Sequence, residues 1–121
     1  GRVLGEGMSP QERQRQRVLF QKGRFPVLLC QIKCAKYGLD CSRADTAIWY
    51  SMPYSLEEYK QASDRIVHPT KKVPLLHLYL LTKGTVDEDI YATLGDKSVT
   101  ASSFMQKVWK RFCERTGRRV A

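Results

Sequence analysis

Short apolar runs that alternate with well-capped helices are the feature that most constrains the fold of this 121-residue chain. Apolar runs lie at residues 25–32, 46–51 and 73–81, and helix signals lie at residues 9–21, 55–67 and 85–94. Strands that alternate with helices imply right-handed crossovers between parallel strands. We therefore expect an α/β fold with a mostly parallel sheet flanked by helices, and with three or four strands.

Three helices start with the same capping signal. Residues 9–12, 55–58 and 85–88 each read Ser/Thr-x-x-Glu, which satisfies orphan backbone N–H groups at a helix start. These helices are expected to end near Gly23, Val67 and Gly95. The run at residues 25–32 is continuously apolar at its centre, so we expect a strand buried on both faces. Residues 98–115 are expected to form a further amphipathic helix with four apolar side chains on one side: Phe104, Val108, Trp109 and Phe112.

The charge balance indicates an anionic partner. Lys and Arg outnumber Asp and Glu by 21 to 12, which gives a net charge of +9. Such an excess points most often to nucleic acid and secondarily to an anionic membrane surface. No apolar run approaches the roughly 20 residues of a transmembrane helix, and the N-terminus has no signal-peptide core, so we expect a cytoplasmic protein that does not enter a membrane.

The four cysteines do not predict a metal site. Three, six and seventy-one residues separate Cys30, Cys34, Cys41 and Cys113, and no His stands close in sequence to complete a zinc ligand set. We expect no metal here, and we expect reduced, partly buried thiols that behave as small hydrophobic groups.

Four segments of the chain together resemble one protein family. The run GLDCSRADTAIWYS, followed by SLEEYKQASDRI, looks like motifs V and VI of the Swi/Snf-type DNA-dependent ATPases, in the second helicase superfamily. LLTKGTVDEDIYATLGDK is similar to the segment that follows in that family, and MSPQERQRQRVLFQKGRFPVLLCQI resembles the helix and strand before motif V. The resemblance implies part of the C-terminal, second RecA-like lobe, a three-layer fold of the P-loop NTPase type.

The resemblance also implies site residues. Gly38 and Asp40 would lie in the motif V turn, and Gln61 and Arg65 would be motif VI residues that contact ATP, with Arg65 reaching the nucleotide as an arginine finger. The residue-level alternative for Arg65 is a surface ion pair with Glu58 or Asp64. Five cations near the same edge are candidates for phosphate contacts with DNA: Lys33, Lys36, Arg43, Lys71 and Lys72.

One departure from the family pattern concerns catalysis. His68 stands where the family has a second motif VI arginine, and neutral imidazole is a poor substitute for a fixed cation. We hypothesise that the parent protein hydrolyses ATP weakly or not at all, or that it recruits a nearby cation such as Lys71. ATPase assays before and after His68→Arg test this hypothesis, and no gain of activity would count against it.

The implied activity needs a second lobe. The chain has no GxxxxGK(S/T) phosphate loop, so we expect it to be inactive by itself, with ATP and Mg²⁺ held mainly by an N-terminal RecA-like lobe. We expect residues 1–97 to form the lobe and residues 98–121 an amphipathic helix with a basic tail. Two alternatives stay open: a non-catalytic basic nucleic-acid-binding module derived from this fold, and a structural lobe that docks an acidic partner.

Overall fold

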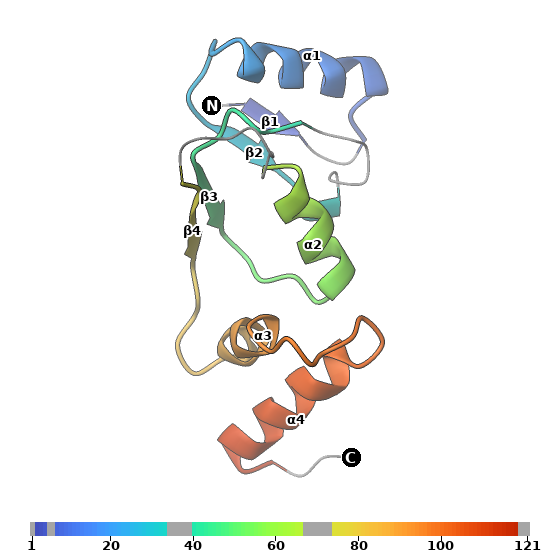
Figure 1. Cartoon of the computed structure of the whole chain (residues 1–121), viewed down its shortest axis with the longest axis vertical. Helices are drawn as coiled ribbons and strands as arrows, with labels where there is room; N and C mark the ends of the chain where they lie inside the picture. Colours follow the sequence, from blue (N-terminus) through green and yellow to red (C-terminus); the bar gives the residue numbers. More distant parts are fainter. Residues whose placement is uncertain (1, 5–6, 34–39, 67–73, 119–121) are drawn as a thin grey trace. The chain divides into compact units, whose positions relative to one another are not determined.

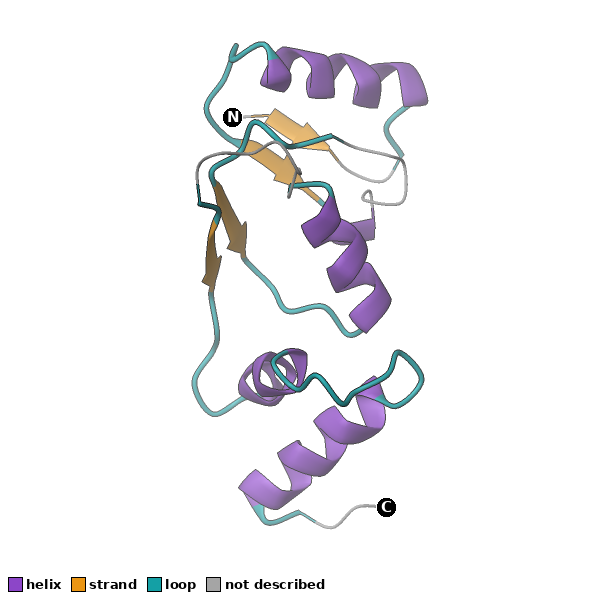
Figure 2. Ribbon diagram, viewed as in Figure 1, coloured by secondary structure: helices purple, strands orange, loops and turns teal. Residues whose placement is uncertain are grey.

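The structure is a computed structural model that describes residues 2–4, 7–33, 40–66 and 74–118. Strands and helices are mixed along these residues, but they do not alternate strictly, because β3 follows β2 directly and α4 follows α3 directly (Figures 1 and 2). In chain order the elements are β1 (Arg2–Leu4), α1 (Pro10–Gln21), β2 (Leu28–Cys30), β3 (Thr46–Trp49), α2 (Leu56–Asp64), β4 (Leu76–Tyr79), α3 (Val86–Leu94) and α4 (Phe104–Thr116). The chain divides into two compact units, one of residues 1–47 and 58–76 and the other of residues 48–57 and 77–121.

Helix α1 of the first unit follows its capping signal. The Ser9 side chain accepts a hydrogen bond from the backbone N–H of Glu12 at 3.1 Å, and Pro10 occupies the first helical turn. The helix ends before Gly23, whose φ of 75° suits a residue without a side chain. Phe20 of α1 is buried, and its ring centroid lies 5.9 Å from that of buried Phe25. This contact joins α1 to the segment that leads into β2.

Strands β1 and β2 form a parallel pair in the first unit. Arg2 pairs with Leu28 and Leu4 with Cys30, and α1 packs against β1 (Figure 1). The expected strand at residues 25–32 is thus shorter, and its burial on both faces is wrong, because Leu29 is 56% exposed and Cys30 is also exposed. Among the described strands, β1 is the one that pairs with β2.

Strands β3 and β4 form the second parallel pair. The N–H of Leu76 donates to the carbonyl of Asp45. Four residues later along both segments, the N–H of Leu80 donates to the carbonyl of Trp49. Side chains alternate between the faces of this pair. Ile48, Leu76 and Leu78 are exposed, whereas the rings of Trp49, His77 and Tyr79 stack on the opposite face, with centroids 6.0–6.2 Å apart.

Helices α3 and α4 build the core of the second unit, where they pack together (Figure 1). Thr85 caps α3 by accepting from the N–H of Asp87, and the helix ends at Gly95, as expected. The core contains six buried apolar side chains: Met52, Leu56, Ile90, Val99, Phe104 and Val108.

An ion pair between exposed Arg115 and buried Asp89 also joins α3 to α4. Nη2 of Arg115 donates to the carboxylate of buried Asp89 at 2.8 Å and to the carbonyl of Thr85 at 3.0 Å. These bonds raise the pKa of Arg115, chiefly through the hydrogen bond to Asp89. The pair therefore fixes the end of α4 against the start of α3.

The last helix differs from its prediction in two ways. It begins at Phe104 rather than near Ser98, because residues 98–103 form turns in which the Thr100 N–H donates to the Ser103 hydroxyl at 3.0 Å. Its buried side consists of Phe104, Val108 and Cys113, whereas Trp109 is 45% exposed. The amphipathic character is confirmed, but the expected position of Trp109 on the apolar side is wrong.

Candidate nucleotide and nucleic-acid site

The candidate site lies at the end of α2, in the first unit. Gln61 lies on the last turn of this helix and is exposed, whereas Arg65 is half-buried and lies just beyond the helix. The predicted helix to Val67 is too long, since α2 ends at Asp64. The N–H groups of Arg65 and Ile66 instead bond the carbonyls three residues earlier, at 3.3 and 3.1 Å, as in a tight 3₁₀ turn.

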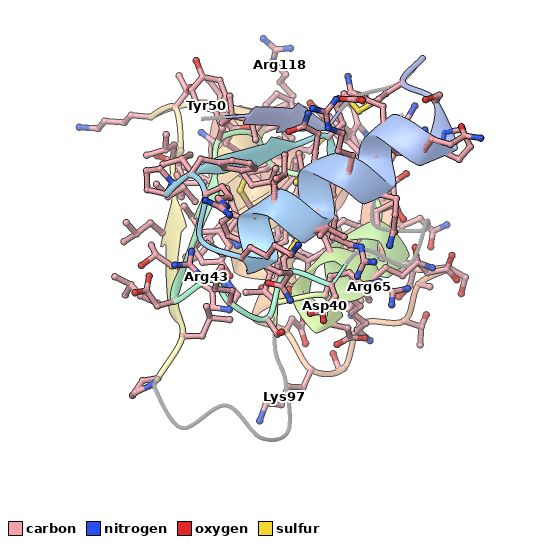
Figure 3. The ribbon with its side chains drawn as sticks, turned by 90° about the horizontal axis from the view of Figure 1, so that it is seen from above. Asp40, Arg43, Tyr50, Arg65, Lys97 and Arg118 are labelled. Atoms are coloured by element: carbon pink, nitrogen blue, oxygen red, sulfur yellow. The ribbon has the colours of Figure 1, made fainter. Side chains whose placement is uncertain are left out.

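The segment expected to follow the motif V turn is hydrogen-bonded to this end of α2. The backbone N–H of Cys41 donates to the carbonyl of Arg65 at 2.8 Å. Immediately before Cys41, the carboxylate of Asp40 accepts from the N–H of Ser42 at 2.9 Å and closes a local Asx turn. Figure 3 shows Asp40 and Arg65 close together. The structure thus brings these two predicted site residues to the same place.

Arg43 occupies a different position from Arg65 (Figure 3). Its guanidinium lies over the Phe20 ring, 6.0 Å from the centroid, and next to Gly23, where a Cβ atom would lie 2.7 Å from Nη2. Its backbone N–H donates to the Gln21 side chain at 3.3 Å. Arg43 is exposed, but its charge is held against the C-terminal end of α1.

The other predicted site residues divide into two groups. Lys33 is described and exposed, three residues after β2. Gly38, Lys36, His68, Lys71 and Lys72 lie outside the described residues, so their predicted roles stay predictions. In the part of the chain that the structure describes, no three His, Cys, Asp or Glu side chains gather where they could hold a metal ion.

Sequence reasoning missed two features of this region. It did not foresee the backbone bond between Cys41 and Arg65, because a bond between N–H and C=O carries no side-chain signature. It also did not foresee that the pKa of Cys41 is lowered, chiefly by the Cys30 side chain.

Comparison with known families identifies the region that contains this site. Residues 2–69, more than half of the chain, match the helicase conserved C-terminal domain. The chain belongs to this family. The helicase match contains α1, β1, β2, β3 and α2, and therefore both Asp40 and the Gln61–Arg65 segment.

A solved structure shows that the helicase fold continues beyond the matched residues. The chain is similar to the structure described as the C-terminal part of the Fun30 ATPase domain, with a TM-score of 0.70 and 16% sequence identity. The similarity covers 97% of this chain and 40% of that one. It confirms the α/β, RecA-like fold and the resemblance to a partial C-terminal helicase domain. The chain spans less than half of the Fun30 chain that it matches.

Two further findings leave the helicase assignment unchanged. No curated protein matches the sequence. Among the described residues, no helix has the length and the apolar character needed to cross a membrane.

Proposed function

We propose that this helicase domain is part of the second RecA-like lobe of a Swi/Snf-like, ATP-dependent DNA translocase that acts in the cytoplasm. Residues 1–97 would belong to the lobe and residues 98–121 would add the amphipathic helix and basic tail. Membership of the helicase family supports the use of ATP and contact with nucleic acid. The observation that carries the proposal is the 2.8 Å bond between Cys41 and Arg65, which links the motif V segment to the motif VI segment.

The donor groups at this place fit a nucleotide phosphate. Gln61 offers an exposed amide, and Arg65 offers a guanidinium, which is always charged and binds phosphate oxygens in a two-pronged fork. Carboxylates that would hold Mg²⁺ do not gather among the described residues. The proposal assigns the metal and most of the nucleotide to an N-terminal RecA-like lobe. ATP with Mg²⁺ would supply the phosphoryl group whose transfer drives movement.

The role proposed for Arg65 is to neutralise charge as the γ-phosphate leaves. Such a cation is worth about 10³- to 10⁵-fold in rate when it is supplied by a neighbouring lobe. Its tight turn, fixed by the bond from Cys41, would limit the positions that the guanidinium samples. Asp40 would lie on the nucleotide side of the same turn, where it can accept a hydrogen bond.

The proposal is tested in the chain joined to its N-terminal lobe. Arg65→Ala should reduce kcat for ATP hydrolysis by about 10³-fold or more, because the transition state loses its cation. The matched control is Lys60→Ala, which removes an exposed cation from helix α2, just before the turn that carries Arg65. The control should retain the parent activity.

A third variant addresses the missing second arginine. His68→Arg should raise DNA-stimulated ATPase activity if the parent enzyme is weak for lack of this cation.

Equal activity of Arg65→Ala and Lys60→Ala would contradict the role of Arg65. The same 121-residue chain without the other lobe should turn over no more ATP than its Arg65→Ala variant.

A further inference from the structure

The last helix, α4, presents apolar side chains to solvent. Met105 and Trp109 are 41% and 45% exposed. Because residues at i, i+4 and i+7 share one side of a helix, Phe112 lies on the same side as these two. The rings of Trp109 and Phe112 are stacked, with centroids 5.3 Å apart and planes 25° apart. Exposed apolar side chains that gather in one place mark interaction sites, whereas single ones are ordinary.

Two arginines lie over the Phe112 ring of this stack. The guanidinium carbons of Arg115 and Arg118 are each 5.6 Å from its centroid, within the range of cation–π attraction. Arg118 follows Gly117, which ends the helix in the left-handed region with a φ of 73°, a conformation that suits glycine. Two cations, a phenyl ring and an indole ring therefore form one contiguous group, and Trp109 is the more exposed of its two rings.

The charge around this group is positive. Residues 104–118 contain one acidic residue, Glu114, and five cations: Lys107, Lys110, Arg111, Arg115 and Arg118. Two of the cations, Arg111 and Arg115, form ion pairs with carboxylates in and after α3, at 3.3 and 2.8 Å. Lys110 and Arg118 are exposed. These two are therefore the candidates for contacts with an anionic partner at this surface.

We propose that α4 and Arg118 form a binding surface for single-stranded nucleic acid. An unpaired base stacks on Trp109, and Lys110 and Arg118 bind the neighbouring phosphates. Every base has a ring face, so such stacking tolerates any sequence, and the phosphates supply the complementary negative charge. In a duplex the bases stack on one another, which leaves Trp109 no base to contact. An acidic peptide would match the cations, but its carboxylates give no reason for an exposed indole ring.

This surface goes beyond the proposed function. Asp40 and Arg65 belong to the first unit, whereas α4 belongs to the second. Binding of a strand to α4 needs neither ATP nor a second lobe. An ATPase assay that contradicts the role of Arg65 would therefore leave the α4 surface intact, and a failure of strand binding at α4 would leave the role of Arg65 intact.

Binding of a labelled thymidine oligonucleotide to the 121-residue chain tests the role of Trp109. A strand of about 12 nucleotides is long enough for one such surface. Fluorescence anisotropy should show that Trp109→Leu, which keeps an apolar side chain but removes the ring, weakens binding by about 5- to 100-fold. Trp109→Phe should retain most of the affinity, because it keeps a ring face.

The matched control for Trp109 is Tyr50→Ala. Tyr50 is 85% exposed and lies outside α4, so its loss removes an exposed aromatic ring without touching the proposed surface. This variant should bind the thymidine strand as tightly as the parent chain does. Equal affinities of Trp109→Leu and Tyr50→Ala would overturn the proposal.

A strand of the same length without bases separates stacking from charge. It keeps the phosphates, so the parent chain should bind it, but more weakly than the thymidine strand. Trp109→Leu should bind the abasic strand as tightly as the parent chain does, and the same should hold for a duplex. An equal loss on the thymidine strand, the abasic strand and the duplex would overturn the proposal, because the substitution would then act through the fold rather than through a base.

Salt titrations test the two cations. Lys110→Gln and Arg118→Gln should each reduce the slope of log K against log salt by about 0.7, the value for one phosphate of a single strand. Trp109→Leu should leave the slope unchanged, because a ring neutralises no phosphate. Unchanged slopes in both cation variants would overturn the proposed phosphate contacts.

A copolymer of glutamate and tyrosine tests the acidic-peptide alternative. It carries carboxylates and aromatic rings but has neither phosphates nor bases. The parent chain should bind the copolymer more weakly than a thymidine strand of equal charge. Tighter binding of the copolymer that is lost in Trp109→Leu would overturn the proposal in favour of a protein partner.

Discussion

At the scale of single residues, His77 shows how one hydrogen bond fixes a protonation state. Nε1 of Trp49 donates to Nδ1 of His77 at 3.1 Å, so Nδ1 must carry a lone pair. Burial between the aromatic rings lowers the pKa of His77 below its usual 6.5. His77 is thus a half-buried, hydrogen-bonded residue of β4.

The lowered pKa of His77 predicts that stability depends on pH. The unfolded chain takes up a proton near pH 6.5 while the folded chain resists it, so stability is full above 6.5 and is lost as pH falls through the lower folded pKa. Urea unfolding at about pH 7.5 and pH 5.5 should show this loss. His77→Gln should reduce the difference in the free energy of unfolding between the two pH values. An equal loss in that variant would assign the effect to other groups.

At the scale of elements, the starts of the capped helices α1 and α3 were predicted best, whereas the start of α4 and the burial of β2 were not. Ser9 and Thr85 cap α1 and α3 as expected because capping is local and needs only neighbouring residues. The burial of β2 depends on which strands lie beside it, and an apolar run cannot specify its partners. The end of α2 was misjudged for a similar reason, since Arg65 leaves the helix where Cys41 bonds its carbonyl.

The core built by α3 and α4 predicts that substitutions at two isoleucines, Ile90 and Ile48, differ strongly in their effect on the free energy of unfolding. Ile90 is fully buried, so Ile90→Ala should reduce the free energy of unfolding by about 2–5 kcal/mol, and Ile90→Val by about 0.5–1.5 kcal/mol. Ile48 is 62% exposed, and Ile48→Ala should change it by less than about 0.5 kcal/mol. Urea unfolding of the three variants measures these values. Similar losses at positions 48 and 90 would contradict the described core.

At the scale of the whole molecule, the net charge of +9 and membership of the helicase family both support the proposal that nucleic acid is a partner, and the contacting residues stay predictions. Four segments in one order led from the sequence to the helicase family, because such order is far more specific than a single motif. The fold followed from the alternation of strands and helices. The site could be placed on loops, but its geometry could not be predicted, because it depends on a backbone bond between segments twenty-four residues apart.

DNA binding of the whole chain should be weak and should depend steeply on salt. A net charge of +9 favours binding to phosphates, and removing one cation that neutralises a phosphate reduces the slope of log K against log salt by about 0.9. Lys33→Gln should lower the slope by about this amount. Arg43→Gln should lower it less, because that guanidinium packs against Gly23 and Phe20.

A salt titration of fluorescently labelled duplex DNA measures these slopes. Lys97→Gln is the control, since it removes an exposed cation that is not a candidate for phosphate binding. A slope that does not respond to Lys33→Gln, or binding that is insensitive to salt, would contradict the predicted phosphate contacts.

Because Arg43 packs on Gly23, we expect positions 23 and 43 to co-vary among related sequences. A side chain at position 23 would push the guanidinium away from Phe20, in addition to straining a backbone with φ of 75°. A substitution at one position would therefore change which residues are tolerated at the other, twenty residues along the chain. Related sequences with another residue in place of Gly23 should also lack an arginine at the position of Arg43. The origin of this co-variation would be steric rather than functional.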